Sequence, residues 1–280
     1  MNKFHSAIIS VAIALNIFLC GCQMSVKDET SIANEILKSA RKTVVLSDNW
    51  RFQLDINDIG EDEQWFTEDF DRGNWARVTV PQAWNCYGPA MWGYEGTGWY
   101  ATTINSHDFT AGMRTEIVFN RVMYYSKVWI NGNYIGDNIG GYLPFSFNIT
   151  DHLKPGQENT LVVRANNVPR IDWLPAANRI EWIQYGGILQ PVKLVGSSPT
   201  YIDDFTVRTE PENGGAKIEC LVNIINETDT ESEMELNVEI TRGAGIAAKG
   251  VRFQCKPKES TKVTFHLKLD RADLWSPDTP

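Results

Sequence analysis

The dipeptide Asn131-Gly132 joins two runs of apolar and aromatic residues in the middle of the chain. A two-residue type I′ turn needs positive φ at both central positions, and Asn and Gly tolerate that conformation best. The pattern therefore predicts a β-hairpin over residues 124–136. Further along, Phe145, Phe147 and Ile149 alternate with polar residues, which is typical of a strand with one buried face. Antiparallel sheet is the structure that this region favours.

Short segments rich in β-branched and aromatic residues lie on both sides of this hairpin, separated by turn residues. Strands are predicted at 44–54, 78–80, 98–103, 115–122, 145–150, 161–164 and 190–195. Eight or more short strands without a convincing helix predict a β-sandwich of the jelly-roll (galactose-binding-like) type over residues 44–197.

After Ser197-Ser198-Pro199 the predicted strands become longer and more regular. Residues 216–225, 234–240 and 261–269 alternate apolar with polar side chains, which places His266 on a solvent face. This pattern is typical of an immunoglobulin-like sandwich, a fold of about seven strands in about 100 residues. Only about 80 residues follow position 197. We therefore predict an all-β chain whose second sandwich, 198–280, is truncated before its closing strands and exposes unpaired strand edges.

The first 22 residues have the features of an export signal. Lys3 supplies a positive n-region, and residues 7–19 supply an apolar segment of suitable length. Leu19-Cys20-Gly21-Cys22 resembles the lipobox of bacterial lipoproteins, in which a small residue precedes the lipidated cysteine, so Cys22 fits that role better than Cys20. An ordinary secretory signal is the alternative. We expect an exported lipoprotein, anchored to the membrane by lipid at Cys22, in the periplasm or at the outer membrane or cell surface, with residues 23–43 as a tether.

Composition and cysteine usage argue against several classes of partner. The formal net charge of −9 would repel nucleic acid at long range. The four histidines are scattered and no Cys-x-x-Cys pair occurs, so we expect neither a metal site nor a cofactor. Cys220 and Cys255 are predicted to point into one core, either as a disulfide or as two free thiols.

The order of several short motifs is more specific than any one of them. These motifs are Asn49-Trp50-Arg51-Phe52, Asp71–Trp75 with Val78–Pro81 and Trp84, Gly98-Trp99-Tyr100, Val128–Gly136, Gly140–Phe145, and Tyr185-Gly186-Gly187-Ile188 with Pro191-Val192. In this order they resemble the N-terminal portion of glycoside hydrolase family 2, which includes β-galactosidases, β-glucuronidases and β-mannosidases. The resemblance covers about residues 44–280.

The resemblance implies a jelly-roll sugar-binding domain, then an immunoglobulin-like sandwich, then a (β/α)₈ barrel. That barrel performs retaining hydrolysis with two glutamates. A barrel needs about 200–250 residues of alternating strand and helix. The sequence contains no such stretch and ends in a segment, Leu274-Trp275-Ser276-Pro277, that resembles the family's second sandwich. We therefore assign no catalytic residue to this chain.

Two loops carry the aromatic and polar side chains that a carbohydrate site uses. One spans residues 84–92 and includes Asn85, Tyr87 and Trp92; the other spans residues 170–182. The resemblance implies that the second loop contributes to the substrate pocket in an intact enzyme. The predicted substrate-binding residues there are Asp172, Trp173, Asn178, Arg179 and Glu181. The alternative is that the tryptophans of both loops pack against other domains.

The sequence thus predicts the non-catalytic N-terminal part of a retaining exo-β-glycosidase, a fragment inactive on its own, with carbohydrate as the ligand. Two alternatives stay open. One is a free-standing surface glycan-binding lipoprotein. The other is a piece complemented in trans by a separate subunit that supplies the catalytic barrel.

Overall fold

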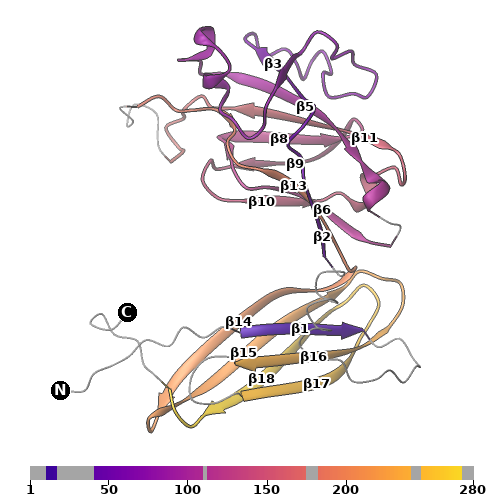
Figure 1. Ribbon diagram of the computed structural model, residues 1–280, viewed down its shortest axis with the longest axis vertical. Coiled ribbons are helices and arrows are strands. Elements are labelled where there is room, and N and C mark those ends of the chain that lie inside the picture. The colour runs from indigo at the N-terminus through magenta and orange to yellow at the C-terminus, as the bar shows by residue number, and fades with distance from the viewer. Residues whose placement is uncertain (1–10, 18–40, 110–111, 175–181, 241–246, 273–280) are drawn as a thin grey trace, which may run out of the picture. The chain divides into compact units, whose positions relative to one another are not determined.

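The computed structural model describes residues 11–17, 41–109, 112–174, 182–240 and 247–272, and the regular secondary structure of these residues consists of β-strands and a few short 3₁₀ turns (Figure 1). The chain divides into two compact units. One comprises Arg41–Ser197, and the other comprises Ser198–Pro280 with the first 40 residues. The predicted all-β fold class is confirmed.

The unit formed by residues 41–197 is a sandwich of antiparallel sheets. The six-stranded sheet contains, in spatial order, β4 (Ala76–Val78), β3 (Trp50–Asp55), β5 (Thr97–Asn105), β11 (Glu158–Asn166), β8 (Tyr125–Ile130) and β9 (Asn133–Ile139). The four-stranded sheet contains β10 (Phe145–Asn148), β6 (Arg114–Phe119), β13 (Val192–Ser197) and β2 (Lys42–Val45). A two-stranded ribbon contains β12 (Gly187–Ile188) and β7 (Val122–Met123). The short 3₁₀ turns are η1 (Trp84–Cys86), η2 (Pro89–Met91), η3 (Ser106–Asp108) and η4 (Thr150–His152).

The predicted hairpin is present as β8 and β9. Its turn residues Asn131 and Gly132 have φ of 50° and 77°, the positive values that the Asn-Gly pair was expected to supply. The pairing shifts register once, between Val128 and Trp129. Val128 pairs with Gly136 and Trp129 with Tyr134, so Ile135 is the extra residue and the bulge lies in β9. β8 keeps its alternation, with Val128 and Ile130 in the inner core and Trp129 on the outer face of the sheet.

The main core lies between the six-stranded and four-stranded sheets. Trp50, Phe52 and Tyr100 from one sheet pack with Ile117 and Phe119 from the other, and all five are almost completely buried. Alternate residues of each strand supply this core, as the period of two requires.

The six-stranded sheet also carries apolar side chains on its outer face. The connection between β3 and β4 lies over this face and places Trp65 and Trp75 against Trp99 and Trp129. The rings of Trp99 and Trp129 stack with centroids 5.3 Å apart. Because this cover reaches only the middle of the face, side chains at both ends of the strands line open depressions.

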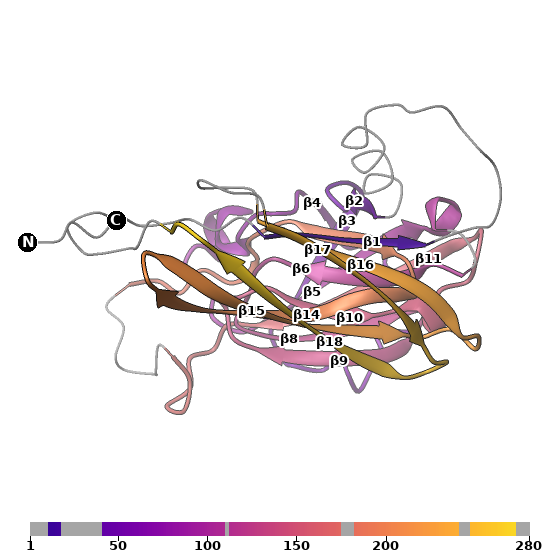
Figure 2. The same cartoon turned by 90° about the horizontal axis from the view of Figure 1, so that it is seen from below.

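The second unit contains two three-stranded sheets. One is formed by β14 (Thr200–Glu212), β15 (Gly215–Asn226) and β18 (Ser260–Leu269); the other by β1 (Val11–Ile17), β16 (Ser232–Ile240) and β17 (Ala247–Cys255). Both are antiparallel, and the strands β14 to β18 are visible together in Figure 2. Alternate residues of β15, β16 and β18 form one apolar core.

This core confirms the predicted orientation of the cysteines. Cys220 and Cys255 are both buried in it, and both are free thiols. His266 is exposed, as the alternation of β18 predicted.

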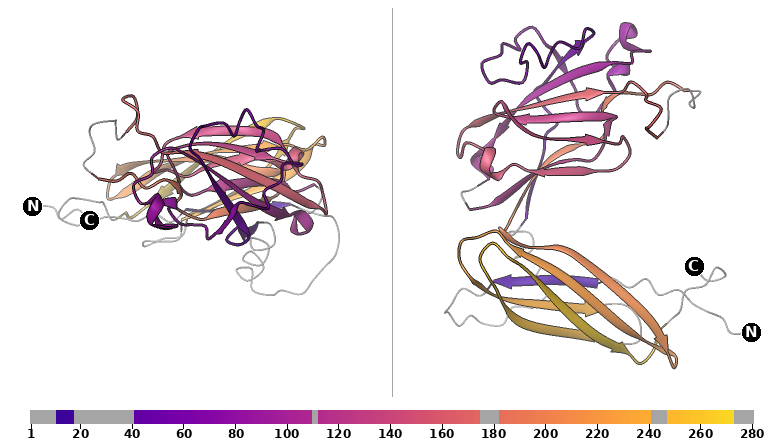
Figure 3. Two further views of the ribbon diagram at one scale, coloured as in Figure 1. Left: turned by 90° about the horizontal axis from the view of Figure 1, so that it is seen from above. Right: turned by 180° about the vertical axis from the view of Figure 1, so that it is seen from behind.

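The segment Val11–Ile17, which belongs to the predicted export signal, pairs along β16, with Val11 opposite Ile240 and Ile17 opposite Met234 (Figure 3). Export and cleavage stay predictions. Cys22 and residues 23–40 of the predicted tether lie outside the described residues. Among the residues described, no helix has the length and apolar character to cross a membrane.

Candidate functional site

A depression of about 550 Å³ lies on the outer face of the six-stranded sheet, where β8, β9 and β11 meet the chain that leaves β11. Its lining combines two arginines and two aspartates with aromatic and amide groups. The lining residues are Tyr125, Asp137, Ile139, Arg164, Asn166, Val168, Arg170, Asp172 and Trp173. We call this depression the β11 pocket.

The floor of the β11 pocket is built by strand register. Arg164 on β11 lies opposite Lys127 on β8, which lies opposite Asp137 on β9. Two residues further on, Asn166 lies opposite Tyr125, which lies opposite Ile139. Directly opposed side chains on one face stand about 4.5–5.5 Å apart at Cβ. The floor is therefore one charged row beside one mixed aromatic and amide row.

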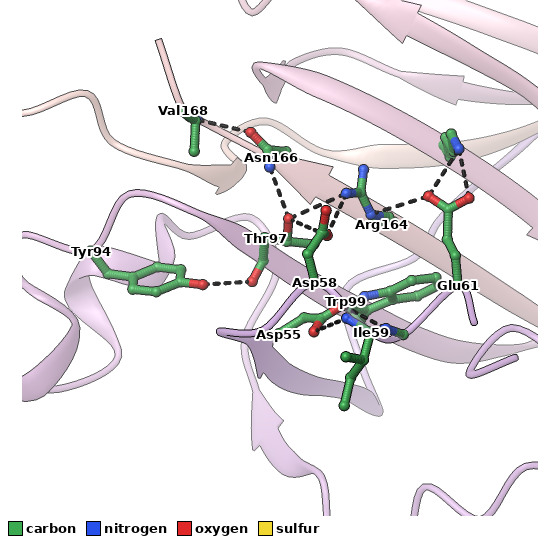
Figure 4. A network of polar contacts seen from close by, with 12 residues as sticks. Asp55, Asp58, Ile59, Glu61, Tyr94, Thr97, Trp99, Arg164, Asn166 and Val168 are labelled. Carbon is green, nitrogen blue, oxygen red and sulfur yellow. Dashed lines mark hydrogen bonds and ion pairs between the residues drawn. The ribbon is translucent and has the colours of Figure 1, made fainter. Parts of the chain in front are cut away.

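Arg164 is the centre of the charged network shown in Figure 4. Its Nη2 donates to Oδ1 of Asp58 at 2.6 Å and to Oγ1 of Thr97 at 3.3 Å. Its Nε lies 3.3 Å from Oε1 of Glu61, an ion-pair contact whose angle is not that of a hydrogen bond. The side chain is only 8% exposed, so these partners fix the guanidinium in place. Among the described residues nothing accepts from its Nη1, which leaves that group free for a ligand.

The acidic partners of Arg164 come from the connection between β3 and β4. Glu61 also accepts from Nζ of Lys127, at 2.9 and 2.6 Å to its two oxygens. Burial alone would raise the pKa of the Asp58 carboxyl, but the hydrogen bond and charge of Arg164, with smaller contributions from Thr97 and Lys127, lower it below its ordinary value. Asp58 is therefore the ionised partner of a buried arginine.

The wall of the pocket is the chain that follows β11. Asn166 donates to Thr97 at 2.8 Å and accepts from the backbone of Val168 at 2.9 Å, which fixes the direction in which the chain leaves the strand. Arg170 and Asp172 then form a two-bond ion pair, with Nε–Oδ1 and Nη2–Oδ2 distances of 3.0 and 3.1 Å. This pair lowers the pKa of Asp172 and keeps both charges at the rim.

Trp173 closes this wall. Its ring stacks on Tyr124 with centroids 4.6 Å apart, and the guanidinium of Arg170 lies 5.3 Å from its centroid. The Tyr124 hydroxyl accepts from the backbone of Leu174 at 3.1 Å. Trp173 therefore serves mainly to hold the wall against the sheet.

The predicted site residues meet different outcomes. Asp172 and Trp173 line the β11 pocket together, while Asn178, Arg179 and Glu181 lie outside the described residues. Trp182 is described and is 64% exposed.

The other predicted loop, residues 84–92, mostly supports the fold. Trp84 is completely buried, and Asn85 donates to the carbonyls of Met91 and Trp92 while accepting from Gly186. Of the three candidate side chains Asn85, Tyr87 and Trp92, only Trp92 is largely exposed. The alternative of tryptophans as packing residues therefore holds for Trp84, although its partners belong to its own sandwich.

Sequence reasoning missed the floor of the pocket. Tyr125 was treated only as part of the hairpin predicted over residues 124–136, Asp137 lies just beyond that hairpin and was not considered, and Arg164 was treated only as the end of an apolar strand. A signal was available for Arg164, because a charged residue directly after Leu161-Val162-Val163 must either end the strand or face away from the core. Here it faces away, on the outer face of the sheet.

The arrangement suits the recognition of a polyhydroxylated ligand. Carboxylates, a guanidinium and an amide, each held by a neighbour, present fixed acceptors and donors, and Tyr125 and Ile139 add apolar surface. The described part of the chain contains no group of three His, Cys, Asp or Glu side chains that could hold a metal ion.

Comparison with known families decides the assignment. Residues 44–197 match the sugar binding domain of the glycosyl hydrolases family 2, and residues 200–280 match a further domain of the same family. The chain belongs to glycosyl hydrolase family 2. The resemblance stated from the motifs is confirmed.

Family 2 relatives are similar along most of this chain. It is 26% identical to a β-galactosidase of Thermoanaerobacter pseudethanolicus, over 81% of this chain and 30% of the relative. It is 28% identical to a β-glucuronidase of Bacteroides fragilis, over 86% of this chain and 34% of the relative. The chain thus spans about a third of the length of these family 2 proteins.

Solved structures of β-glucuronidases share the fold. A Bacteroides uniformis β-glucuronidase superposes with a TM-score of 0.70 at 21% identity, over 85% of this chain and 29% of the other. A Ruminococcus gnavus β-glucuronidase gives 0.61 at 20% identity, over 78% and 44%. At these identities the likeness supports the fold alone.

Proposed function

We propose that this chain is the non-catalytic, saccharide-binding N-terminal part of a retaining exo-β-glycosidase. The observation that carries the proposal is the β11 pocket, in a unit that matches a sugar binding domain. Hydrolysis then belongs to a (β/α)₈ barrel with two glutamates, and no such barrel occurs among the described residues. The relatives' names favour β-galactosides and β-glucuronides as substrate classes.

Activity measurements test the non-catalytic part of the proposal. The purified chain should not hydrolyse chromogenic β-galactosides, β-glucuronides or β-mannosides, and adding a family 2 barrel in cis or in trans should restore turnover. Sustained turnover by the chain alone, at constant specific activity through purification, would refute it.

Binding measurements test the pocket. Calorimetric titration with β-linked oligosaccharides should give measurable heat, and Arg170→Ala or Asp172→Ala should weaken binding about threefold to tenfold, which corresponds to one or two lost hydrogen bonds. Both residues are exposed, so the variants should fold. Arg208→Ala and Glu219→Ala, which break an exposed ion pair in the other unit, are the matched controls. Equal affinities in all four variants would exclude the pocket.

A free-standing surface glycan-binding protein is the second candidate. The observation that favours it is that residues of unit 41–197 line the β11 pocket by themselves, so saccharide binding needs no other domain. Strong glycan affinity that does not change when a catalytic barrel is supplied would favour this candidate over the first.

We also propose that the protein is exported and lipidated at Cys22. The support is the n-region, the apolar segment and the Gly21-Cys22 pair. Labelling with radioactive palmitate in a bacterial host should be lost in Cys22→Ser and retained in Cys20→Ser. The reverse result would identify Cys20 as the lipidated residue. No label in either protein would support an ordinary secretory signal instead.

A further inference from the structure

A second depression, of about 280 Å³, lies on the same outer face but toward the opposite ends of β5 and β11. Asn49, Arg51, Phe70, Arg72, Gly73, Ala101, Thr102, Thr103 and Thr160 line it. We call it the arginine cavity, because it contains two guanidinium groups and no acidic side chain. Its size is close to the lower end of the range of about 300–1,000 Å³ for small-molecule sites.

Arg51 is held so that one edge of its guanidinium stays free. Its Nη1 donates to the carbonyls of Gly73 at 3.0 Å and Trp75 at 3.2 Å. Among the described residues nothing accepts from its Nε or Nη2. These two nitrogens form the side of the fork that binds both oxygens of a carboxylate or sulfate.

Arg72 adds a second positive charge without a counter-ion. Its nitrogens donate to the carbonyls of Trp65, Thr67 and Phe70, and its Nε is buried without a hydrogen bond. Burial lowers the pKa of this guanidinium, in keeping with a charge that has lost water and gained no carboxylate.

Strand register brings in a third arginine. Arg77 on β4 is the direct cross-strand partner of Arg51 on β3, strands that lie side by side in Figure 2. Like charges directly opposite on one sheet face are destabilising. No ion pair to a carboxylate joins any of the three arginines in the part of the chain that the structure describes. A bound anion would remove this repulsion.

The rest of the lining suits a sugar ring. Thr103 and Thr160 lie directly opposite each other on β5 and β11, and neither hydroxyl has a hydrogen bond among the described residues. Phe70 supplies an aromatic wall. Paired hydroxyls, an aromatic ring and a free guanidinium edge together match a saccharide that carries a negative group.

We propose that the arginine cavity binds an acidic saccharide, with its carboxylate on the free Nε–Nη2 edge of Arg51 and its hydroxyls at Thr103 and Thr160. This site is separate from the β11 pocket, and it rests on the proposed function only in taking carbohydrate as the ligand class.

The test compares methyl β-D-glucuronide with methyl β-D-glucoside, which differ in the carboxylate, by calorimetry or ligand-observed NMR on the full chain. The glucuronide should bind at least tenfold more tightly at low salt, and raising the salt from 50 to 500 mM should remove most of that preference because salt screens the charges. Equal affinity for both sugars would overturn the proposal.

Variants locate the site. Arg51→Gln should abolish the preference, Arg51→Lys should reduce it because a lysine keeps the charge but loses the fork, and the exposed Arg77→Gln should weaken glucuronide binding about threefold. Arg208→Gln, an exposed arginine of the other unit, should have no effect. Because Arg51 also donates to two backbone carbonyls, thermal melts must show that its variants are folded. Arg77→Gln tests the site without removing a hydrogen bond that supports the fold of the described residues. A preference that survives Arg51→Gln and Arg77→Gln in folded protein would refute the assignment.

Competition with sodium sulfate and sodium acetate separates a saccharide site from a simple anion site. If either salt binds as tightly as the glucuronide, the cavity holds an adventitious ion only and the saccharide assignment fails. Neutral oligosaccharides at the β11 pocket should bind equally in the Arg51 variants. The two sites can therefore fail independently.

Discussion

Trp99 donates its indole hydrogen to Oδ2 of Asp55 at 2.9 Å, and both side chains are almost completely buried on the outer face of the six-stranded sheet. The same carboxylate accepts from the backbone of Ile59 and of Gly60, each at 2.9 Å. One aspartate at the end of β3 thus fixes both the tryptophan and the start of the covering segment that carries Asp58 and Glu61 to Arg164.

Asp55→Ala should lower the free energy of unfolding by about 2–4 kcal/mol, because three donors, two of them buried, lose their acceptor. Urea denaturation followed by tryptophan fluorescence measures this loss, and saccharide binding at the β11 pocket should weaken with it. The exposed Asp62→Ala is the control. If Asp55→Ala and Asp62→Ala unfold at the same urea concentration, Asp55 does not organise the cover.

Asn131→Gly separates two roles of the hairpin asparagine. Gly also accepts positive φ, so a residue needed only for the turn would be replaced at little cost. In the structure, however, the Asn131 amide donates to His152 and Asn159 and its oxygen accepts from Thr160. We expect a loss of about 2–3 kcal/mol in unfolding free energy, measured by denaturant titration. A loss below about 0.5 kcal/mol would mean that turn geometry alone matters.

Gly187→Ala should be strongly destabilising. Gly187 has a φ of 98°, and a Cβ there would meet the Tyr100 hydroxyl at 2.1 Å and the Trp84 ring at 3.1 Å. We expect a loss of about 2–4 kcal/mol from backbone strain and overpacking, seen as a lower thermal midpoint. Gly93→Ala, where a Cβ would meet nothing within 4 Å, is the matched control and should change the midpoint little.

Asp58 should contribute to the acid sensitivity of the fold. Its pKa is lower in the folded state than in the unfolded chain, so the ionised form stabilises the fold above about pH 4, and this contribution is lost as the pH falls through the folded-state pKa. Between pH 7 and pH 2.5 the wild type should therefore lose more unfolding free energy than Asp58→Asn.

The difference should be small, at most about 1 kcal/mol, because the Asp58 side chain is 60% exposed and solvent screens the pair. Urea denaturation at each pH measures this difference without adding a salt that would screen the ion pair, and Asp62→Asn is the control. A larger acid loss in Asp58→Asn than in wild type would contradict the sign.

Thiol reactivity should distinguish the three cysteines of the described sandwiches. Cys86 is exposed, whereas Cys220 and Cys255 are buried, and burial raises the pKa of the Cys220 thiol. We expect one fast-reacting thiol in native protein and three after unfolding of a chain that lacks Cys20 and Cys22. Two fewer thiols after unfolding would reveal a disulfide between Cys220 and Cys255.

Local patterns carried much of the fold. Three of these patterns depend only on near neighbours in the chain, and each is present in the structure. They are the Asn-Gly turn, the alternation of Phe145 and Phe147 with polar residues, and the alternation of buried with exposed side chains along β18. The motif order added what the individual strands could not, because it identified the family before any contact was known.

The candidate site was harder to predict from the sequence, because segments that are far apart in the chain assemble it. Arg164 meets Asp58 across 106 residues, and the register of β8, β9 and β11 decides which side chains share a row. Pairing between non-neighbouring strands is not encoded in local periodicity. Loop 84–92 shows the same limit, since its aromatic residues fit either a ligand surface or packing, and only the structure shows that Trp84 is completely buried.

The connection between β3 and β4, which covers the middle of the outer face, affects which amino-acid substitutions this domain can accept. Trp99 and Trp129 pack on one face of the sheet, and Tyr100 and Val128 pack on the other. A shift of strand pairing by one residue would move both sets to the wrong face, so packing on each face fixes the strand register independently. Side chains at the open ends of β8, β9 and β11 can then be replaced without disturbing the strand alignment. Substitutions at a few outward-facing positions can therefore change the ligand preference while the sandwich stays the same. Libraries of variants at Tyr125, Asp137 and Ile139 would test this first.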